Sequence, residues 1–371
     1  MRIKYSIERI IKFKVIILIT FLVNGCFIAN HLVPLNNIPK PTGVYNVGTQ
    51  IFEWKDENRE EWFTDIKTDK RRLMVQVWYP TLDKDTNYIN YLDFPKKRIA
   101  PLSQRVGLPK YLIQHIKNVK SNSILNASVR VDSNKYPLVI FSHGLGGMRM
   151  QNSVQMEELA SKGYMVIAMD HAYDAYVTIY KDGSIAEFRS WLRDDASEEE
   201  FWNVRLPQIN TRSQDVSFII DKVFDLKQNG NKFWMNINLS KIGVMGHSYG
   251  GATSILSAYN DKRIAACINL DGWMEPIIPE VIRNGINIPF LYIGQLKWDD
   301  TPLNNIKLDS LVNSSNGKKI LIPETKHFDY SDTPHFSPLA VKFGLAGTID
   351  MDILRNQINS EIISFFDLHL K

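Results

Sequence analysis

The chain has 371 residues, of which 44% are hydrophobic, enough to bury a sizeable core in one large domain or two small ones. Its formal net charge of +4 lies in residues 1–25, which hold five of the 44 basic and one of the 40 acidic residues, so the remainder has 39 of each. This neutral body argues against a nucleic-acid-binding surface, and two cysteines are too few for a disulfide framework or a cysteine-based zinc site.

The N-terminal residues predict export. A basic start precedes the apolar run 15–23, as in an export signal. Cys26 follows Asn24 and Gly25, an order similar to the lipobox of bacterial lipoproteins, which makes Cys26 the candidate for lipidation. The alternative is an uncleaved anchor that continues to Val33, because nine apolar residues alone are too short to span a bilayer. We therefore expect residues 1–26 to be a signal peptide or membrane anchor, and the protein to be secreted or tethered outside the cytoplasm.

The next segments precede the main alternation of strands and helices. Residues 27–41 contain three prolines and predict a linker. Leu73–Tyr79 has the composition of a strand and should stop before Pro80. Residues 81–105 are polar and predict a loop. In 109–119, apolar residues recur at helical spacing among lysines, which predicts a helix that either packs on the core or contacts lipid.

A strand, a helix and a second strand are expected between residues 137 and 169. Pro137–Ser142 and Tyr164–Met169 are continuous apolar runs, typical of strands buried on both faces of a parallel sheet. Ser153–Ser161 predicts the helix between them. This order predicts parallel strands joined by a right-handed crossover.

Residues 171–205 interrupt this alternation and predict an insertion, with a hairpin around Lys181-Asp182-Gly183. The predicted fold class is α/β, a mostly parallel central sheet with helices on both faces, in one domain over residues 42–371. The remaining predicted elements are helices at 211–226 and 353–368 and strands at 241–245, 264–270, 288–294 and 318–322.

The turn after strand 241–245 carries the main chemical motif. Gly246–Gly250 reads GHSYG and fits GxSxG, in which glycines flank a serine on a turn too tight for larger residues. An apolar strand before it and a helical packing face after it provide the setting that the motif requires. Ser248 is therefore the candidate nucleophile, and the alternative is an ordinary Gly-rich turn. The glycines lack GxGxxG spacing, and we expect neither a cofactor nor a metal.

A serine hydroxyl is a weak nucleophile at neutral pH, so Ser248 needs a base within hydrogen-bond reach. In this architecture the acid and then the histidine follow the serine along the chain, each at the end of a strand. His327 comes within a few residues of the strand Lys319–Pro323 and is the candidate base. His335 is held in reserve.

Two positions compete for the acid that orients this base. Asp271 directly follows the run 264–270, whereas Asp299 and Asp300 come a few residues after the strand 288–294. The α/β-hydrolase fold commonly places the acid after the later strand. Spacing alone leaves the choice open.

The tetrahedral intermediate of ester cleavage also needs hydrogen-bond donors for its oxyanion. The backbone N–H of Tyr249, the residue after the nucleophile, is one expected donor. The second should come from the loop after strand 137–142, which reads His143-Gly-Leu-Gly-Gly147. Its candidate is the N–H of Leu145.

Four motifs occur in a specific order: PTGVYNVG at 41–48, FSHGLGG at 141–147, GHSYGGA at 246–252 and LDGWM at 270–274. Together they resemble the secreted platelet-activating-factor acetylhydrolase family, a serine-dependent branch of the α/β-hydrolases, in a bacterial-type member. The resemblance extends from about Pro41 to the C-terminal helix.

The resemblance implies roles for individual residues. It makes Ser248 the nucleophile, His327 the base and Asp271 the acid, because the LDGWM motif carries the family's aspartate, and it places the oxyanion donors on Leu145 and Tyr249. It also implies hydrolysis of short or truncated acyl esters of phospholipids. The segment 109–119 occupies the place where family members touch lipid surfaces, although it is more polar here.

Two other functions fit the same residues. A general carboxylesterase or polyester hydrolase would use the same triad on another ester. From a different class, the chain would be a non-catalytic, membrane-tethered binding protein that kept the fold. The sequence does not indicate an oligomeric state.

Overall fold

A computed structural model of the chain describes residues 32–371, except 86, 134, 297 and 299–300. The predicted leader with Cys26, and the alternative acids Asp299 and Asp300, lie outside the described residues. Within the described ranges, no helix combines the length and the hydropathy needed to cross a membrane.

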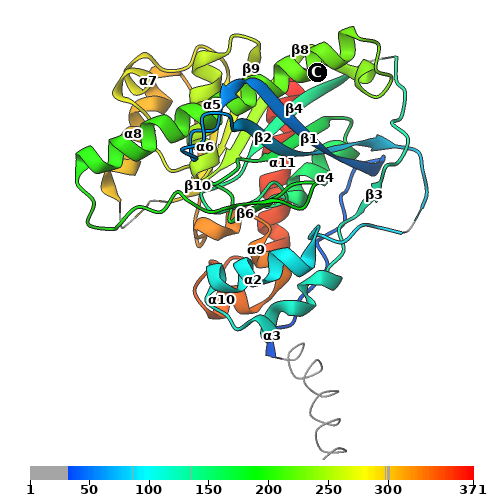
Figure 1. Cartoon of the computed structure of the whole chain (residues 1–371), viewed down its shortest axis with the longest axis horizontal. Coiled ribbons are helices and arrows are strands. Elements are labelled where there is room, and N and C mark those ends of the chain that lie inside the picture. The colour runs from blue at the N-terminus through cyan, green and yellow to red at the C-terminus, as the bar shows by residue number, and fades with distance from the viewer. Residues whose placement is uncertain (1–31, 86, 134, 297, 299–300) are drawn as a thin grey trace, which may run out of the picture.

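The centre of the molecule is a nine-stranded sheet with the order β11-β10-β9-β8-β4-β5-β2-β1-β3 (Figure 1). Six neighbouring strands, β11 to β5 in this order, run parallel, and β2 is antiparallel to both β5 and β1. The predicted mostly parallel α/β sheet is confirmed. The strands are β1 (Asn46–Glu60), β2 (Lys70–Thr81), β3 (Ser123–Leu125), β4 (Tyr136–Ser142), β5 (Met165–Asp170), β8 (Ile237–His247), β9 (Ile264–Leu270), β10 (Phe290–Gln295) and β11 (Lys318–Ile322), with β6 (Val177–Ile179) and β7 (Ile185–Glu187) in a separate hairpin.

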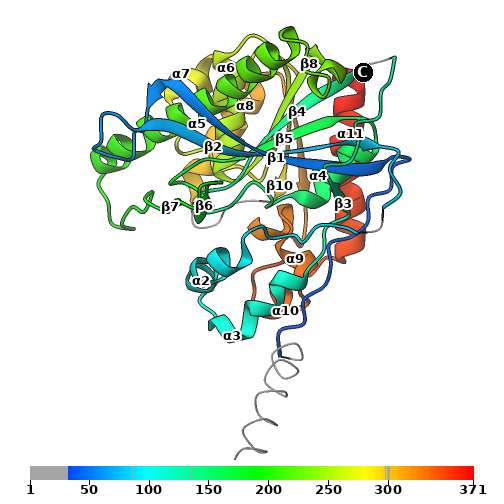
Figure 2. The same cartoon turned by 45° about the vertical axis from the view of Figure 1, so that its right-hand side comes forward.

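Helices cover both faces of this sheet (Figures 1 and 2). On one face, α5 and α6 bury side chains such as Ile219 and Ile255 in a large core that also includes residues of α7 and α8. On the other face, α4 and α11 pack Leu159 and Phe366 against the sheet. The helices are α2 (Pro95–Val106), α3 (Lys110–Ile113), α4 (Ser153–Ser161), α5 (Glu198–Gln228), α6 (Tyr249–Asn260), α7 (Pro279–Asn284), α8 (Pro302–Ser314), α9 (Thr333–Phe336), α10 (Leu339–Lys342) and α11 (Met351–Leu370), with 3-10 turns η1 (Gln114–Asn118), η2 (Trp234–Asn236) and η3 (His327–Tyr330).

The short helices α2, α3, α9 and α10 lie together below the sheet in both views (Figures 1 and 2). They surround a third core, in which Ile99 and Ile116 pack near Met150 of the loop before α4. Ile38, from the segment predicted to be a linker, is buried in the same core. The first described residues are therefore packed onto this helical group.

Four local predictions are corrected by the structure. The strand predicted to stop before Pro80 continues through it to Thr81, and Pro80 is paired with Val47 of β1. Residues 81–105, predicted as a loop, contain the first eleven residues of α2, which is strongly basic and buries only Arg98 and Ile99. The predicted continuous helix over 109–119 is divided into the four-residue α3 and the 3-10 turn η1. The helix predicted from Thr211 begins at Glu198, inside the predicted insertion, and includes Pro207.

Candidate active site

Ser248 occupies a strained turn between β8 and α6. Its φ of 57° and ψ of −123° are unusual for a residue with a side chain. The turn is closed by two glycines: a Cβ on Gly246 would lie 2.1 Å from the carbonyl oxygen of Gly250, and one on Gly250 would lie 1.9 Å from that of Ser142. No larger residue fits at either position, which is the physical reason for the GxSxG pattern.

The structure brings Asp271 and His327 into direct contact. Nδ1 of His327, in the turn after β11, lies 2.7 Å from Oδ2 of Asp271, at the end of β9. The carboxylate is fully buried, whereas the imidazole is 28% exposed. An acid in this position fixes the orientation and tautomer of a histidine base.

Asp271 is held by three further residues from β10 and the loop that follows it. The hydroxyl of Tyr292 and the backbone N–H of Gln295 each donate to Oδ1 over 3.0 Å. The Gln295 side chain donates to Oδ2, also over 3.0 Å, and the indole of Trp298 donates to Oδ1 over 3.2 Å. With His327, all the acceptor positions of this buried carboxylate are in use, so its orientation is fixed.

His247, the residue before Ser248, places the ring of His327. The two rings lie 4.6 Å apart at their centroids, and Nε2 of His247 donates to the backbone carbonyl of His327 over 2.9 Å. Nδ1 of His247 accepts a 2.8 Å hydrogen bond from the amide of Gln151. Burial, and to a smaller extent the nearby His327, lowers the pKa of His247 to about 3, so the imidazole stays neutral in this tautomer.

The other end of the Gln151 amide holds the loop that contains Leu145. Its Oε1 accepts from the N–H of Gly144 over 2.9 Å. A Cβ on Gly144 would lie 3.1 Å from Cβ of Ser248, so this loop runs directly against the candidate nucleophile. Gln151 therefore connects the loop of the predicted oxyanion donor with the residue that places the predicted base.

Within the part of the chain that the structure describes, two N–H groups close to Ser248 have no hydrogen-bond acceptor. The N–H of Leu145 has no acceptor among the described residues, and Tyr249 is the first residue of α6, where N–H groups have no partner within the helix. The Ser248 hydroxyl also lacks a hydrogen bond within the described part of the chain. In enzymes without substrate, the bond between nucleophile and base is often long and shortens when substrate binds.

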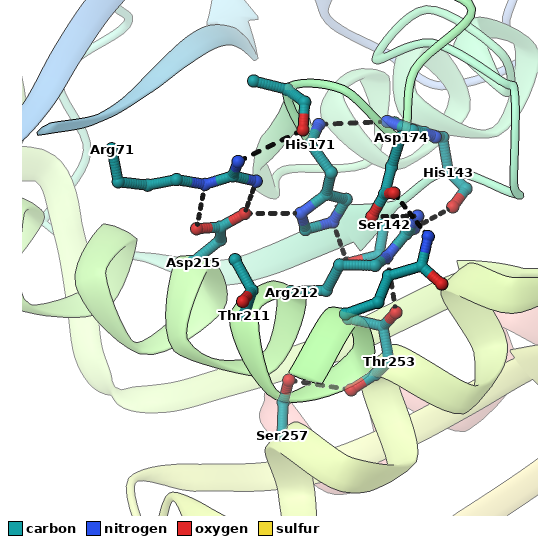
Figure 3. A network of polar contacts seen from close by, with 12 residues as sticks. Arg71, Ser142, His143, His171, Asp174, Thr211, Arg212, Asp215, Thr253 and Ser257 are labelled. Atoms are coloured by element: carbon teal, nitrogen blue, oxygen red, sulfur yellow. Dashed lines mark hydrogen bonds and ion pairs between the residues drawn. The ribbon is translucent and has the colours of Figure 1, made fainter. Parts of the chain in front are cut away.

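A buried polar network contacts the loop that begins at His143 (Figure 3). Arg212 of α5 is fully buried; it donates to the backbone carbonyl of His143 and, over 2.9 Å, to the hydroxyl of Thr253 in α6. Its Nη1 lies 3.6 Å from a carboxylate oxygen of Asp174, and its guanidinium carbon lies 4.8 Å from the ring centroid of Tyr249. A single cation thus joins the loop that begins at His143 to the helix that follows Ser248.

The remaining predicted residues lie elsewhere. His335, the reserve base, is in α9, where burial lowers its pKa to about 4 and the nearest charges are those of Arg355 and Asp352. Within the described ranges, no group of three or more His, Cys, Asp and Glu residues has the arrangement of a metal site. Sequence reasoning missed Gln151 and Arg212, and gave no role to His247 although it lies within GHSYG.

A serine on a strand-to-helix turn of a mostly parallel sheet, with an acid and a histidine from later strand ends, defines an α/β-hydrolase of the carboxylic ester hydrolase class. The family model described as "Platelet-activating factor acetylhydrolase, isoform II" matches residues 32–371, so the chain belongs to this family.

Individual relatives agree with this assignment. The chain is 30% identical to the platelet-activating factor acetylhydrolase of Canis lupus familiaris and 29% identical to that of Bos taurus; each match covers 90% of this chain and 78% of the relative. A probable 1-alkyl-2-acetylglycerophosphocholine esterase of Arthroderma benhamiae is 26% identical, over 86% of this chain and 82% of its own. Among solved structures, a ferulic acid esterase from Streptomyces cinnamoneus matches with a TM-score of 0.71 and 25% identity, over 90% of this chain and 93% of that one.

Proposed function

We propose that this protein is a serine esterase that removes short or truncated acyl chains from phospholipids through an acyl-enzyme. The observation that carries the proposal is the 2.7 Å contact between Asp271 and His327 beside the Ser248 turn, in a member of this family. The names of the relatives support a substrate with an acetyl ester on a glycerophosphocholine.

The residues perform the reaction in two halves. His327 takes the proton of Ser248 as the serine oxygen attacks the ester carbonyl, and Asp271 stabilises the imidazolium. The N–H groups of Leu145 and Tyr249 bind the oxyanion. His327 then gives the proton to the departing alcohol, which leaves the acyl group on Ser248. Water, activated by His327, releases the carboxylic acid and restores the serine.

The direct test is an acyl-chain series on phospholipids that differ only at the sn-2 ester, from acetyl to palmitoyl, with wild type and Ser248→Ala. We expect wild type to prefer acetyl and other short chains and the variant to lose nearly all turnover. Retained turnover of the acetyl substrate by Ser248→Ala would contradict the assignment of the nucleophile.

The choice of acid has its own test. Asp271→Asn and, separately, the double change of Asp299 and Asp300 to Asn are compared on the same acetyl ester. Loss of activity only in the first supports the acid assigned here, whereas loss only in the second would transfer the role to the later loop.

A general carboxylesterase is the second candidate function, favoured by the structural match to a ferulic acid esterase. Water-soluble aryl esters distinguish the two: a general esterase would turn them over as fast as an sn-2 acetyl phospholipid. A non-catalytic binding protein would not react covalently with an organophosphonate.

We also propose that the protein is exported and held at a membrane through its N-terminal residues, on the evidence of the apolar run 15–23 and Cys26. Metabolic labelling with a radioactive fatty acid tests lipidation. Incorporation that disappears in Cys26→Ser supports a lipid anchor, and membrane association without incorporation supports the uncleaved anchor instead.

A further inference from the structure

An apolar cavity of about 450 Å³ lies within the group of short helices below the sheet. Its volume is in the range of sites that bind small molecules. Its lining contains no charged residue, and helices α2, α3, α9 and α10 all contribute to it. Representative lining residues are Leu102, Val106, Ile113, Phe336, Leu339 and Ala340.

The cavity is open to an apolar ligand. Concave apolar sites of this size, open at one side, are typical of places where proteins bind apolar ligands. Three of its lining side chains are substantially exposed, Val106 at 47%, Phe343 at 63% and Leu345 at 44%. These residues form a rim through which a ligand can enter.

A second hollow lies beside the proposed base and shares one lining residue with this cavity. It is lined by His327, Phe328 and Trp298 together with the charged residues Glu324 and Lys326. Leu345 lines both spaces. Gln151, which bonds to Gly144 beside Ser248, lines the apolar cavity from the side of the catalytic residues. The hollow beside His327 and the apolar cavity are therefore neighbours, and Leu345 stands between them.

The chemistry of the proposed reaction decides which part of the substrate lies there. His327 must protonate the departing alcohol, so the alcohol half of the ester has to lie on its side of the site. In a glycerophospholipid, that half carries the polar headgroup and the hydrocarbon chain that is not hydrolysed. The polar hollow beside His327 suits the glycerol and headgroup, and the uncharged cavity beyond Leu345 suits the chain.

We propose that the apolar cavity bounded by α2, α3, α9 and α10 binds the hydrocarbon chain that the leaving alcohol retains. This inference rests on the proposed esterase function and adds a specificity for the sn-1 chain. Binding removes each methylene group from water, which favours long chains by up to about fourfold per group.

The test uses sn-2 acetyl glycerophosphocholines with sn-1 alkyl chains of four to twelve carbons, all below their critical micelle concentrations. No lipid surface is then present, so any dependence on chain length arises within the protein. For wild type we expect kcat/KM to rise at least about 30-fold along the series, mainly through KM.

Two variants fill the cavity, and one neighbour serves as control. Ala340→Trp and the more exposed Val106→Trp should reduce the rise in kcat/KM along the series to below about threefold. Val341→Trp adds the same side chain to α10 at a residue that is 40% exposed and outside the cavity lining, and should keep the wild-type rise. If one of the two filling variants fails to fold, the other still tests the inference.

Other outcomes would overturn the inference. A flat series in wild type, or an equal rise in the filling variants and wild type, would show that the cavity does not hold the chain. If the series is flat below the critical micelle concentrations, and a repeat above them shows a rise that is lost equally in Val341→Trp, the helices would instead contact a lipid surface. If no ester is hydrolysed, including an aryl acetate, the proposed function itself fails.

Discussion

Replacing Gln151 by leucine tests whether one side chain holds both the loop of the proposed oxyanion donor Leu145 and the proposed base His327. Leucine has nearly the same volume, but it removes the 2.8 Å bond to His247 and the 2.9 Å bond from Gly144. Each buried polar group left unpaired costs about 1–3 kcal/mol. Because the Gln151–Gly144 contact is only partly buried, we expect a total loss of about 2–4 kcal/mol, a substantial part of the 5–15 kcal/mol typical of a folded domain.

We expect Gln151→Leu to lower kcat in addition to lowering the stability. Gly144 precedes Leu145, the proposed oxyanion donor, and a displacement of about 1 Å at a catalytic centre can reduce the rate about 100-fold. We expect kcat to fall about 10- to 100-fold with little change in KM, since the donor acts mainly in the transition state. Urea denaturation measures the stability, and steady-state hydrolysis of a soluble acetate ester measures kcat.

The matched control is Gln155→Leu, four residues further along. Gln155 is buried, at 4% exposure, whereas Gln151 is partly buried; Gln155 accepts a 3.0 Å bond from Asn152 and does not contact the site. It should lose stability and keep kcat. If Gln151→Leu loses stability but keeps kcat within about twofold of wild type, or if both variants lose kcat equally, the positioning role is refuted.

Three further predictions follow from the same site. Arg212→Met should destabilise the fold by about 3–5 kcal/mol in urea denaturation, because it leaves Asp174 buried without its cation, and a near-normal stability would contradict the network. The protein should lose stability as the pH falls from about 6.5 towards 3. Burial lowers the pKa of His143 and of His247 to about 3, so in this range the two histidines are protonated in the unfolded chain but not in the folded protein. At pH 5 each histidine contributes about 2 kcal/mol of this loss, measured as a lower Tm by calorimetry, and a Tm that is unchanged between pH 7 and pH 5 would oppose it. Asp271→Asn should reduce kcat by about 10⁴ while retaining substrate binding, because the histidine loses its orienting partner; a change below tenfold would point to another acid.

The regular, buried part of the fold could be predicted from the sequence. Strands β9 and β11 and helix α4 have the predicted bounds. These elements lie in or on the central sheet, so their apolar pattern is set directly by burial. The hairpin around residues 181–183 was also predicted, because Asp-Gly is a strong local turn sequence.

The elements that were missed have a weaker or interrupted pattern. Helix α2 buries only Arg98 and Ile99, and its short apolar stripe of Ile99, Leu102 and Val106 stands among four basic residues and two prolines. The first turns of α5 were not predicted because they are highly charged and because Pro207 is unfavourable inside a helix. Its capping box, Ser197 with Glu200, is nevertheless visible in the sequence as S-x-x-E and identifies the start.

In the site, too, the local features could be predicted from the sequence and the long-range contacts could not. The turn at Ser248 is local, and its glycines made it predictable. The pairing of His327 with Asp271 joins residues 56 apart, and only the family motif favoured this acid over the later strand. Gln151 lies 96 residues from His247, and neither residue carries a sequence mark of the bond between them, so this support required the structure.

The most direct measurement of the central claim is the site of reaction with a fluorophosphonate. One equivalent should add a single adduct to the folded protein, peptide mass mapping should locate it on Ser248, and hydrolysis of a 1-alkyl-2-acetylglycerophosphocholine should stop in the same proportion as labelling proceeds. An adduct on another residue, or full hydrolysis by completely labelled protein, would contradict the assignment of Ser248 as the nucleophile of this esterase.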